Sequence, residues 1–340
     1  MKILLVTQMW PSPEHPDLGS FLVPIRDQLE RVGHRVEVAA ISRRGGSPVK
    51  YARLCAEAAR AARRFRPDVV FAHFLFPAGF AGLLASVGGR APLVVMAHGQ
   101  DVANLGRIPG VTPATRAVVH RAAGIIANSE WLAKLLVERL PAAEPKISIA
   151  DCGIDLEAFA PMPAGPARDE LGWGGPGPAF VCVGSLIERK NVIRLANAFA
   201  RLGEGRLAFV GDGPLRGELE GRERVRVVGR IPQSEVPRWV AAADVLCQPS
   251  LIEPFGQATL EGMAMERSVV ATRVGGPPEF VPAAAGVLVD PLDEDAILAA
   301  LQRAAALPTP NSAARAAAAE HDVVKTVGRM LEALERAAGA

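Results

Sequence analysis

Short apolar segments alternate with longer segments of helical periodicity along the first half of the chain. An apolar run at residues 2–8 is followed by a helical pattern over 21–32 and by a second apolar run at 34–41. This order is typical of a strand, a crossover helix and a parallel strand. The alternation continues and predicts further strands at 68–72, 93–97, 124–127 and 147–150 and helices at 52–65, 78–87, 113–122 and 130–140.

The composition changes at residues 159–178, which are rich in Pro, Gly and Ala. This change predicts a linker at 161–177. A second alternating series follows, with predicted strands at 179–183, 206–210, 225–228, 244–247, 268–272 and 286–289. An Ala-rich segment at 313–338 is predicted to be helical.

The two series predict an α/β fold of two doubly wound, Rossmann-like domains with parallel sheets. The two domains are expected to face each other across a cleft at the carboxyl ends of their strands. They are predicted to comprise residues 1–160 and 178–317, and a C-terminal helix at 318–338 is predicted to pack back on the first domain.

Length and composition describe a soluble globular protein. The chain has 340 residues, of which 49% are hydrophobic and 22% charged, and this length is more than one ordinary core supports. Its four cysteines form no Cys-x-x-Cys pair, which argues against a zinc site or a disulfide framework and fits a reducing cytoplasm. Residues 69–89 carry no charge, but Pro77 and two glycines interrupt them, so a strand, a turn and a buried helix are predicted there rather than a transmembrane segment.

Residues 249–264 are the strongest candidate for a functional site. They follow a predicted strand and precede a short helical pattern, so they form a strand, a loop and a helix N-terminus. The first backbone N–H groups of a helix have no partner within the helix and lie at the positive end of its dipole. The N–H groups of Phe255, Gly256 and Gln257 are therefore predicted to bind an anion.

Two carboxylates belong to the same segment. Glu253 lies in the loop and Glu261 lies eight positions further on, in the helix. Carboxylates beside an anion site are better suited to accept hydrogen bonds from sugar hydroxyls than to bind the anion itself. The ligand that such a site suits has phosphates in the middle and a hydroxylated ring at each end. A nucleotide sugar has this structure.

Three residues at strand ends and one at a helix start could contribute to such a site. Lys190 follows a predicted strand and could neutralise a diphosphate, although a solvated lysine before a helix is as common. Gly211 permits a close backbone approach, but an ordinary turn explains it as well. His98 follows the strand at 93–97, where a catalytic and a structural histidine are equally expected. Gly19 opens the first crossover helix and could approach a phosphate or an acceptor.

These residues resemble the motifs of one known family. The segment Glu253-Pro-Phe-Gly-Gln-Ala-Thr-Leu-Glu261 resembles the Glu-x7-Glu motif of the retaining glycosyltransferases of family 4, also called group 1 glycosyltransferases, which have the two-domain GT-B fold. The resemblance covers nearly the whole chain. Further segments that match are Gly211-Asp-Gly-Pro214, Pro249-Ser250, Val274-Gly-Gly276, Gly153-Ile-Asp155 and His98-Gly99.

The resemblance implies a role for each motif. Glu261 would hold the ribose hydroxyls and Glu253 a hydroxyl of the donor sugar, Lys190 would hold the phosphates, and His98 of the acceptor-binding N-terminal domain would face the reacting sugar. The implied catalytic residues are His98, Lys190 and Glu253. The implied donor-binding residues are Gly19, Ser185, Arg189, Lys190, Gly211, Phe255, Gly256, Gln257 and Glu261. No cofactor and no metal would be required.

Three positions depart from the family pattern. Ser185 stands where the family usually has an arginine, so one diphosphate contact is missing unless Arg189 or another cation supplies it. Residues 266–268 are Glu-Arg-Ser where the family has Gly-x-Pro, and Gly19-Ser20 replaces the common Gly-Gly.

The implied function is transfer of a hexose-type sugar from a UDP- or GDP-sugar to a hydroxyl acceptor, which is a glycan, a lipid-linked molecule or a small molecule. Two alternatives remain open. One is a nucleotide-sugar-binding protein without transfer activity, which the missing arginine at Ser185 motivates. The other is an epimerase on the same fold, or a hydrolase that uses Glu253 and Glu261 as an acid and nucleophile pair. No nucleic acid partner is expected.

A basic stretch at residues 42–66 carries eight cations against the single acid Glu57. On the predicted helix at 52–65, Arg53, Arg60, Arg63 and Arg64 share one face. One interpretation is a weak, reversible contact with the anionic inner face of the membrane. The other is a solvated arginine face, which is favoured because the rest of the helix is mostly Ala and lacks bulky apolar residues that insert into lipid.

Overall fold

The computed structural model describes residues 1–339 and contains two parallel sheets of six strands each. The chain divides into two units. The first comprises residues 1–153 together with the C-terminal segment from Val323, and the second comprises residues 154–322. The predicted α/β class with two parallel sheets is confirmed.

The sheet of the first unit has the strand order β2-β1-β3-β4-β5-β6. Its strands are β1 (Lys2–Thr7), β2 (Arg35–Ala40), β3 (Val69–His73), β4 (Leu93–Ala97), β5 (Gly124–Ala127) and β6 (Ile147–Ile149). Every residue of β3 and β4 is buried, as expected for strands covered on both faces. The strand order reverses at β1, and in such sheets ligands bind outside the carboxyl ends of the strands near this point.

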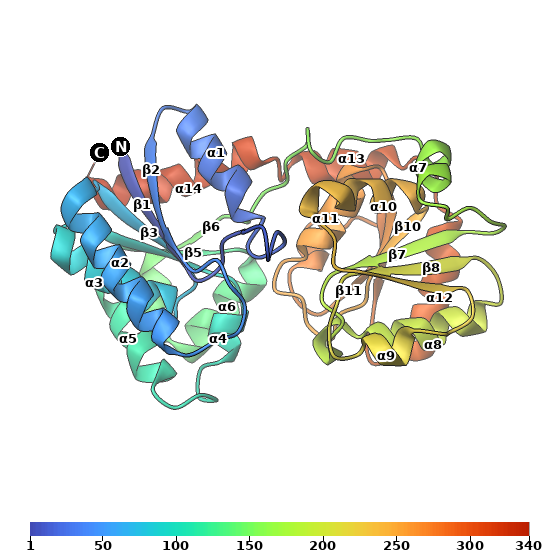
Figure 1. The fold of residues 1–340 in the computed structure, drawn as a ribbon, viewed down its shortest axis with the longest axis horizontal. Helices are drawn as coiled ribbons and strands as arrows, with labels where there is room; N and C mark the ends of the chain where they lie inside the picture. The colour runs from blue at the N-terminus through green and yellow to red at the C-terminus, as the bar shows by residue number, and fades with distance from the viewer. Residues whose placement is uncertain (340) are drawn as a thin grey trace. The chain divides into compact units, whose positions relative to one another are not determined.

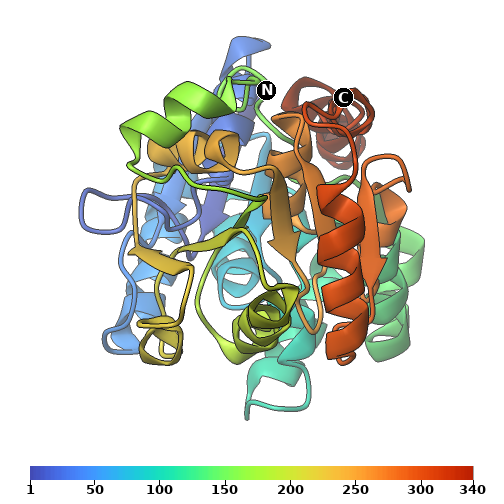
Figure 2. The ribbon, with the colours of Figure 1, turned by 90° about the vertical axis from the view of Figure 1, so that its right-hand side faces the viewer.

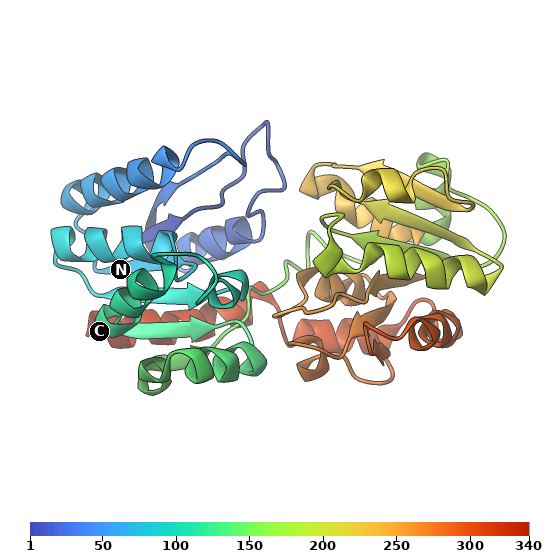
Figure 3. The same ribbon diagram turned by 90° about the horizontal axis from the view of Figure 1, so that it is seen from below.

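Helices cover both faces of the first sheet (Figure 1). On one face lie α2 (Val49–Phe65), α3 (Ala78–Gly89), α5 (Val111–Arg121) and α6 (Glu130–Arg139). On the other face lie α1 (Leu22–Arg31) and α14 (Val323–Ala338). The helices α2 and α3 pack side by side (Figure 3).

The uncharged stretch at 69–89 forms β3, a turn and α3, as predicted. Gly82 lets α3 lie close to the sheet, because a Cβ at this position would approach the Ala72 Cβ to 2.9 Å. Within residues 1–339, no helix combines the length and the apolar character needed to cross a membrane.

The sheet of the second unit has the order β12-β11-β10-β7-β8-β9. Its strands are β7 (Ala179–Val183), β8 (Arg206–Val210), β9 (Val225–Gly229), β10 (Val245–Gln248), β11 (Ser268–Thr272) and β12 (Gly286–Val289). One face is covered by α8 (Val192–Leu202), the short α9 (Arg216–Leu219) and α12 (Glu294–Ala305). The other face is covered by α7 (Ala164–Glu170), α10 (Val236–Ala242), α11 (Gln257–Ala264) and α13 (Ser312–Ala319). Figure 2 shows α8 beside α12.

Short helical segments complete the two units. They are α4 (Gln100–Ala103) and four 3₁₀ helices at Pro141–Lys146, Glu188–Lys190, Gln233–Glu235 and Pro277–Glu279.

The structure places the boundary between the units at Gly153, not at residue 160, and residues 161–177 are not a free linker. They contain α7 and belong to the second unit. The Trp173 ring is buried and packs against the Trp239 ring at a centroid distance of 5.5 Å. Arg168 forms an ion pair with Asp244 at 2.8 Å. Frequent Pro and Gly indicate turns, but they do not show whether the turns pack on a core.

The Ala-rich C-terminal segment forms two helices rather than one. The helices α13 and α14 are separated at residues 320–322, and α13 belongs to the second unit whereas α14 belongs to the first. Thr326 and Arg329 of α14 both donate hydrogen bonds to the buried Asp151 carboxylate, at 2.9 and 3.2 Å. These bonds join α14 to the last residues of the 1–153 segment of the first unit.

Candidate functional site

The loop between β10 and α11 carries the Glu-x7-Glu segment. The helix α11 begins after Gly256, whose φ of +115° is a conformation that glycine adopts without strain. The Phe255 ring is buried against Phe280, at a centroid distance of 5.1 Å. The Phe255 side chain is therefore part of the core, and only its backbone and those of Gly256 and Gln257 remain for a ligand.

Gly275 and Gly276, which follow β11, pack against the backbone of this loop. Glu253 N donates to Val274 O at 3.0 Å, and Gly276 N donates to Glu253 O at 2.9 Å. A Cβ at Gly275 would lie 1.9 Å from the Glu253 carbonyl oxygen. The two glycines therefore allow a backbone contact that fixes Glu253.

Glu253 is buried and forms a close ion pair. Its Oε2 atom lies 2.5 Å from Lys190 Nζ and accepts a hydrogen bond from Ser250 Oγ at 3.1 Å. Burial raises the pKa of Glu253, but Lys190, Arg189 and Ser250 together outweigh burial and leave the pKa below its ordinary value. Glu253 is therefore a carboxylate that compensates the charge of Lys190.

Lys190 is positioned by contacts between two loops. It ends the 3₁₀ turn that follows β7. Leu251 N donates to Arg189 O at 2.8 Å, and Arg189 Nη1 donates to Ile252 O at 3.1 Å. The loops after β7 and β10 thus bring the predicted residues Arg189, Lys190 and Glu253 together.

Glu261 lies in a different environment from Glu253. Its side chain is buried in α11 and accepts one hydrogen bond, from Gln233 Nε2 at 3.1 Å. Burial raises the pKa of Glu261 to about 8. Burial therefore favours the neutral acid form of Glu261, whereas the cations beside Glu253 favour its carboxylate form. Gln233 was not predicted from the sequence, because a single polar residue in a loop gives no signal of what it contacts.

Gly211 allows a second close backbone contact. A Cβ at Gly211 would lie 1.9 Å from the carbonyl oxygen of Gly184, and the φ of Gly211 is +146°. The loops after β7 and β8 consequently pack backbone against backbone. Ser185, which follows Gly184, is exposed. Arg189 is the cation considered as a substitute for the arginine that Ser185 replaces. Its Nη1 atom lies 3.9 Å from Glu253 Oε1.

His98 and Gly19 belong to the first unit, whereas the other predicted site residues belong to the second. His98 Nε2 lies 3.1 Å from His73 Nδ1, and its ring packs against Phe74 at a centroid distance of 4.3 Å. Burial lowers the pKa of His98 to about 3. The imidazole is therefore neutral at physiological pH and can form hydrogen bonds, but it cannot supply a positive charge.

Asp101 holds the turn that presents His98. Its buried carboxylate accepts hydrogen bonds from the backbone N–H groups of Leu75, Gly99 and Val102, at 2.8, 2.8 and 3.1 Å, and from His98 N at 3.2 Å. Burial raises the pKa of Asp101, and these bonds oppose the rise. Asp101 was not among the predicted residues, because its carboxylate accepts from residues that precede it and from the distant Leu75, and no local sequence pattern indicates these contacts.

Gly19 packs against its own loop. A Cβ at this position would lie 2.5 Å from the carbonyl oxygen of Met9, and its φ is +68°. The structure thus explains why glycine is needed here, and its contact with a ligand remains a prediction.

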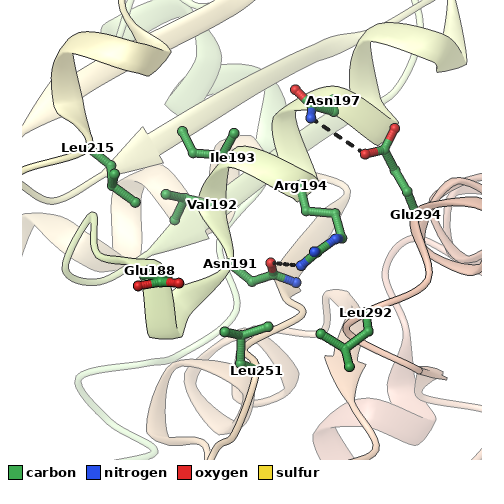
Figure 4. A pocket seen from close by; sticks show the side chains of 10 residues that line it. All are labelled: Glu188, Asn191, Val192, Ile193, Arg194, Asn197, Leu215, Leu251, Leu292 and Glu294. Atoms are coloured by element: carbon green, nitrogen blue, oxygen red, sulfur yellow. Dashed lines mark hydrogen bonds between the residues drawn. The ribbon is translucent and has the colours of Figure 1, made fainter.

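Residues 1–339 contain no cluster of three or more His, Cys, Asp or Glu side chains that could hold a metal ion. A cavity of about 490 Å³ lies between the start of α8 and the start of α12 (Figure 4). Asn191 at its edge is buried and donates to the carbonyl oxygens of Pro249 and Pro291, at 2.9 and 2.7 Å, and it accepts from Arg194. The predicted donor-binding residues do not line this cavity.

Two family models match the chain. Residues 18–158 match the model described as Glycosyltransferase Family 4, and residues 177–306 match the model described as Glycosyl transferases group 1.

The chain is also similar to curated glycosyltransferases. It is 31% identical over 287 residues to D-inositol 3-phosphate glycosyltransferase 1 of Catenulispora acidiphila, covering 75% of this chain and 68% of that protein. It is 29% identical over 245 residues to the putative teichuronic acid biosynthesis glycosyltransferase TuaC of Bacillus subtilis, covering 71% of this chain and 62% of that protein. For two further relatives the chain spans 63% and 45% of their length.

Solved structures share the fold. A sucrose-phosphate synthase from Thermosynechococcus elongatus superposes with a TM-score of 0.80 at 20% identity, covering 99% of this chain and 100% of that chain. The Anabaena protein HepE in complex with UDP and glucose superposes with a TM-score of 0.77 at 24% identity, covering 98% and 99%. The predicted GT-B fold is confirmed.

Proposed function

The chain belongs to the group 1 glycosyltransferases of family 4, and from this premise we propose that it is a retaining glycosyltransferase. It transfers a hexose-type sugar from a nucleotide diphosphate sugar to a hydroxyl acceptor. The observation that carries the proposal is the buried Lys190–Glu253 ion pair beside the N-terminus of α11. In this pair Lys190 is a cation that can bind phosphate, and it lies next to Glu253, a carboxylate that can accept hydrogen bonds from sugar hydroxyls.

Donor binding is expected to rearrange this pair. The diphosphate is expected to bind to the Lys190 ammonium and to the first N–H groups of α11, because both attract negative charge. Glu253 then accepts a hydrogen bond from a sugar hydroxyl instead of from Lys190. Glu261 accepts hydrogen bonds from the ribose hydroxyls.

Transfer proceeds on the front face of the sugar. The bond from the anomeric carbon to the phosphate oxygen breaks, the acceptor oxygen bonds to the same carbon, and the acceptor proton passes to the leaving phosphate oxygen. The protein positions the reactants, and Lys190 stabilises the charge that develops on the diphosphate. Neutral His98 orients the sugar through hydrogen bonds. No metal, cofactor or protein nucleophile takes part.

One observation favours a second candidate function, hydrolysis of the donor. An ionised carboxylate and a neutral carboxylic acid in one site are the pair that glycosidases use, and the surroundings of Glu253 and Glu261 favour these two forms. The ion pair with Lys190 argues against it, because it engages the carboxylate that would act as nucleophile.

The test is a donor screen on the purified protein. A panel of UDP- and GDP-sugars is first compared by thermal shift, because a ligand that binds the folded state raises its apparent stability. UDP-glucose is the first candidate, since UDP and glucose are bound in the Anabaena protein that shares the fold. Release of nucleoside diphosphate is then followed with and without glycan and lipid-linked acceptors.

Release that depends on acceptor, with retained anomeric configuration by NMR, supports the transferase. Donor consumption without acceptor supports the hydrolase or an epimerase. Binding without release under every acceptor condition supports a binding protein that has lost activity. Chelation of divalent metals is expected to leave the rate unchanged.

The proposed location is the cytoplasm. All four cysteines are free thiols in the structure, and three of them are buried. Unpaired cysteines are typical of a reducing compartment.

A further inference from the structure

A cavity of about 350 Å³ lies in the first unit at the carboxyl end of β2, between the loop that follows β1 and the N-terminal turns of α2. Hydrogen bonds join the loop that follows β1 to the residues that follow β2. Trp10 N donates to Ile41 O at 3.0 Å, and Ser12 Oγ donates to Ser42 O at 2.9 Å. The cavity is therefore a defined feature at the edge of the sheet where open parallel sheets bind ligands.

Three cations line this cavity: Arg43, Lys50 and Arg53. Lys50 Nζ donates to Gly45 O at 2.6 Å, which holds the ammonium in place. The exposed side chains of Arg43 and Arg53 form no ion pair within residues 1–339, whereas neighbouring Arg44 pairs with Asp17 at 2.7 Å. Two guanidinium groups are thus available to an external anion, and their planar geometry matches the oxygens of a phosphate.

Two carboxylates, Glu14 and Glu57, also line the cavity. A carboxylate repels a phosphate but accepts hydrogen bonds from hydroxyl groups. A lining that combines three cations with two acids therefore suits a molecule that carries both an anionic group and hydroxyl groups, rather than a bare anion.

We propose that this cavity binds a phosphate-type anionic group of a polyhydroxylated acceptor. The inference rests on the proposed function and names the class of its acceptor. Three strand spacings separate β2 from β4, which leads to His98, and at about 4.8 Å each they span about 14 Å. An acceptor that reaches both places is longer than a single sugar ring, with its phosphate remote from the reacting hydroxyl.

The first experiment measures binding by calorimetry on the full chain without donor. The probes are inorganic phosphate, glycerol 3-phosphate and, as the uncharged counterpart, glycerol. The variant is Arg43→Ala with Arg53→Ala. The matched control is Arg60→Ala with Arg63→Ala, which removes the same charge from exposed positions further along α2 that do not line the cavity.

We expect glycerol 3-phosphate to bind the wild type and the control with equal affinity. Its affinity for the cavity variant is expected to be at least about tenfold weaker, because the bidentate contacts of the two guanidinium groups with the phosphate are lost. Glycerol is expected not to bind. Absence of glycerol 3-phosphate binding to the wild type overturns the proposal, and so does equal weakening in the variant and the control.

A second arm separates a lipid phosphate from a soluble one. Co-sedimentation is compared with phosphatidylcholine vesicles that contain or lack phosphatidic acid. Vesicle binding that the cavity variant loses and the control keeps assigns the phosphate to a lipid-linked acceptor. Binding of glycerol 3-phosphate without vesicle binding assigns it to a soluble one. Vesicle binding lost only in the control indicates contact by the exposed arginine face and overturns the assignment of a lipid phosphate to the cavity.

Failure of this inference can be distinguished from failure of the proposed function. The thermal shift caused by the nucleotide sugar depends on the donor-binding residues, none of which lines the cavity, so the cavity variant keeps it. A missing donor shift in every protein, with glycerol 3-phosphate binding intact, refutes the proposed function alone. A circular dichroism spectrum and melting temperature close to wild type show that the cavity variant is folded.

Discussion

The ammonium of Lys190 lies 2.5 Å from a carboxylate oxygen of Glu253, and both side chains are largely buried. Each is the other's main charge partner, and each is also proposed to contact the donor. The donor must therefore replace an interaction that the free protein already makes. A buried ion pair is costly to break by removing one partner, because the other charge is left desolvated.

Replacing Lys190 with Ala is expected to reduce turnover by about a hundredfold or more, because its charge matters most as the diphosphate departs. The unfolding free energy is expected to fall by about 3 kcal/mol, since Glu253 is left buried with only the more distant Arg189. Steady-state kinetics and chemical denaturation measure the two effects.

The double variant Lys190→Ala with Glu253→Gln separates the roles of the pair. It is expected to recover most of the stability, because no uncompensated charge remains, and none of the turnover. Loss of turnover that only matches the loss of affinity for the free nucleotide would make Lys190 a binding residue without a role in the chemical step.

The pKa of Glu261, about 8 in the ligand-free structure, predicts pH-dependent nucleotide binding. Below about pH 8 the free side chain carries a proton, whereas ribose hydroxyls donate to the carboxylate form. Binding therefore releases a proton, and affinity rises with pH up to about 8, by up to about tenfold per pH unit. Calorimetry in buffers of different ionisation enthalpy measures the proton release.

Glu261→Gln provides the control for this prediction, because its amide resembles the neutral acid. The variant is expected to bind nucleotide with no pH dependence and to lose about 1 to 3 kcal/mol of binding free energy relative to wild type at alkaline pH.

The raised pKa of Glu261 also affects the stability of the folded protein. Because the folded state holds the proton more tightly than the unfolded state does, the unfolding free energy of the wild type falls as the pH rises toward 8, and the variant lacks this fall. Nucleotide affinity of the wild type that does not change with pH would contradict the assignment of Glu261 to the ribose.

Asp101→Asn tests the support of His98. The amide keeps one acceptor oxygen but turns an NH₂ group toward backbone N–H groups, so a loss of about 1 to 3 kcal/mol in unfolding free energy is expected. Turnover is expected to fall because the turn that presents His98 loosens. The thermal shift caused by the donor is expected to persist, because all the predicted donor-binding residues except Gly19 lie in the second unit. Asp68→Asn is the matched control, since exposed Asp68 accepts one backbone N–H, from Lys2. Equal losses in both variants would show that the network around Asp101 has no special role.

The strands were predictable from the sequence because each is a short Val-, Ile- or Ala-rich run bounded by Gly, Pro or charged residues. Trp173 was missed as a core residue because its partner, Trp239, lies 66 positions away in the chain (239 − 173). The contacts of Gln233 and Asp101 were missed for the same reason, since a polar residue gains its role only from the groups that folding brings to it. Motif resemblance located Glu253 and Glu261, but it gave no sign of the opposite shifts in their pKa, which depend on burial and on Lys190.

Gly275→Ala tests whether the glycine pair serves the fold or the ligand. A Cβ at this position would lie 1.9 Å from the Glu253 carbonyl oxygen, and its φ of +123° is strained for any other residue. The loop that carries Glu253 must shift, so we expect a loss of about 3 kcal/mol or more in unfolding free energy. Gly217→Ala is the control, because no atom lies within 4 Å of its added methyl group and its φ is not in the positive range. Thermal melting of the two variants without donor decides the question. A Gly275→Ala protein that melts like the control but no longer binds donor would show that the glycine is needed for ligand contact and not for packing.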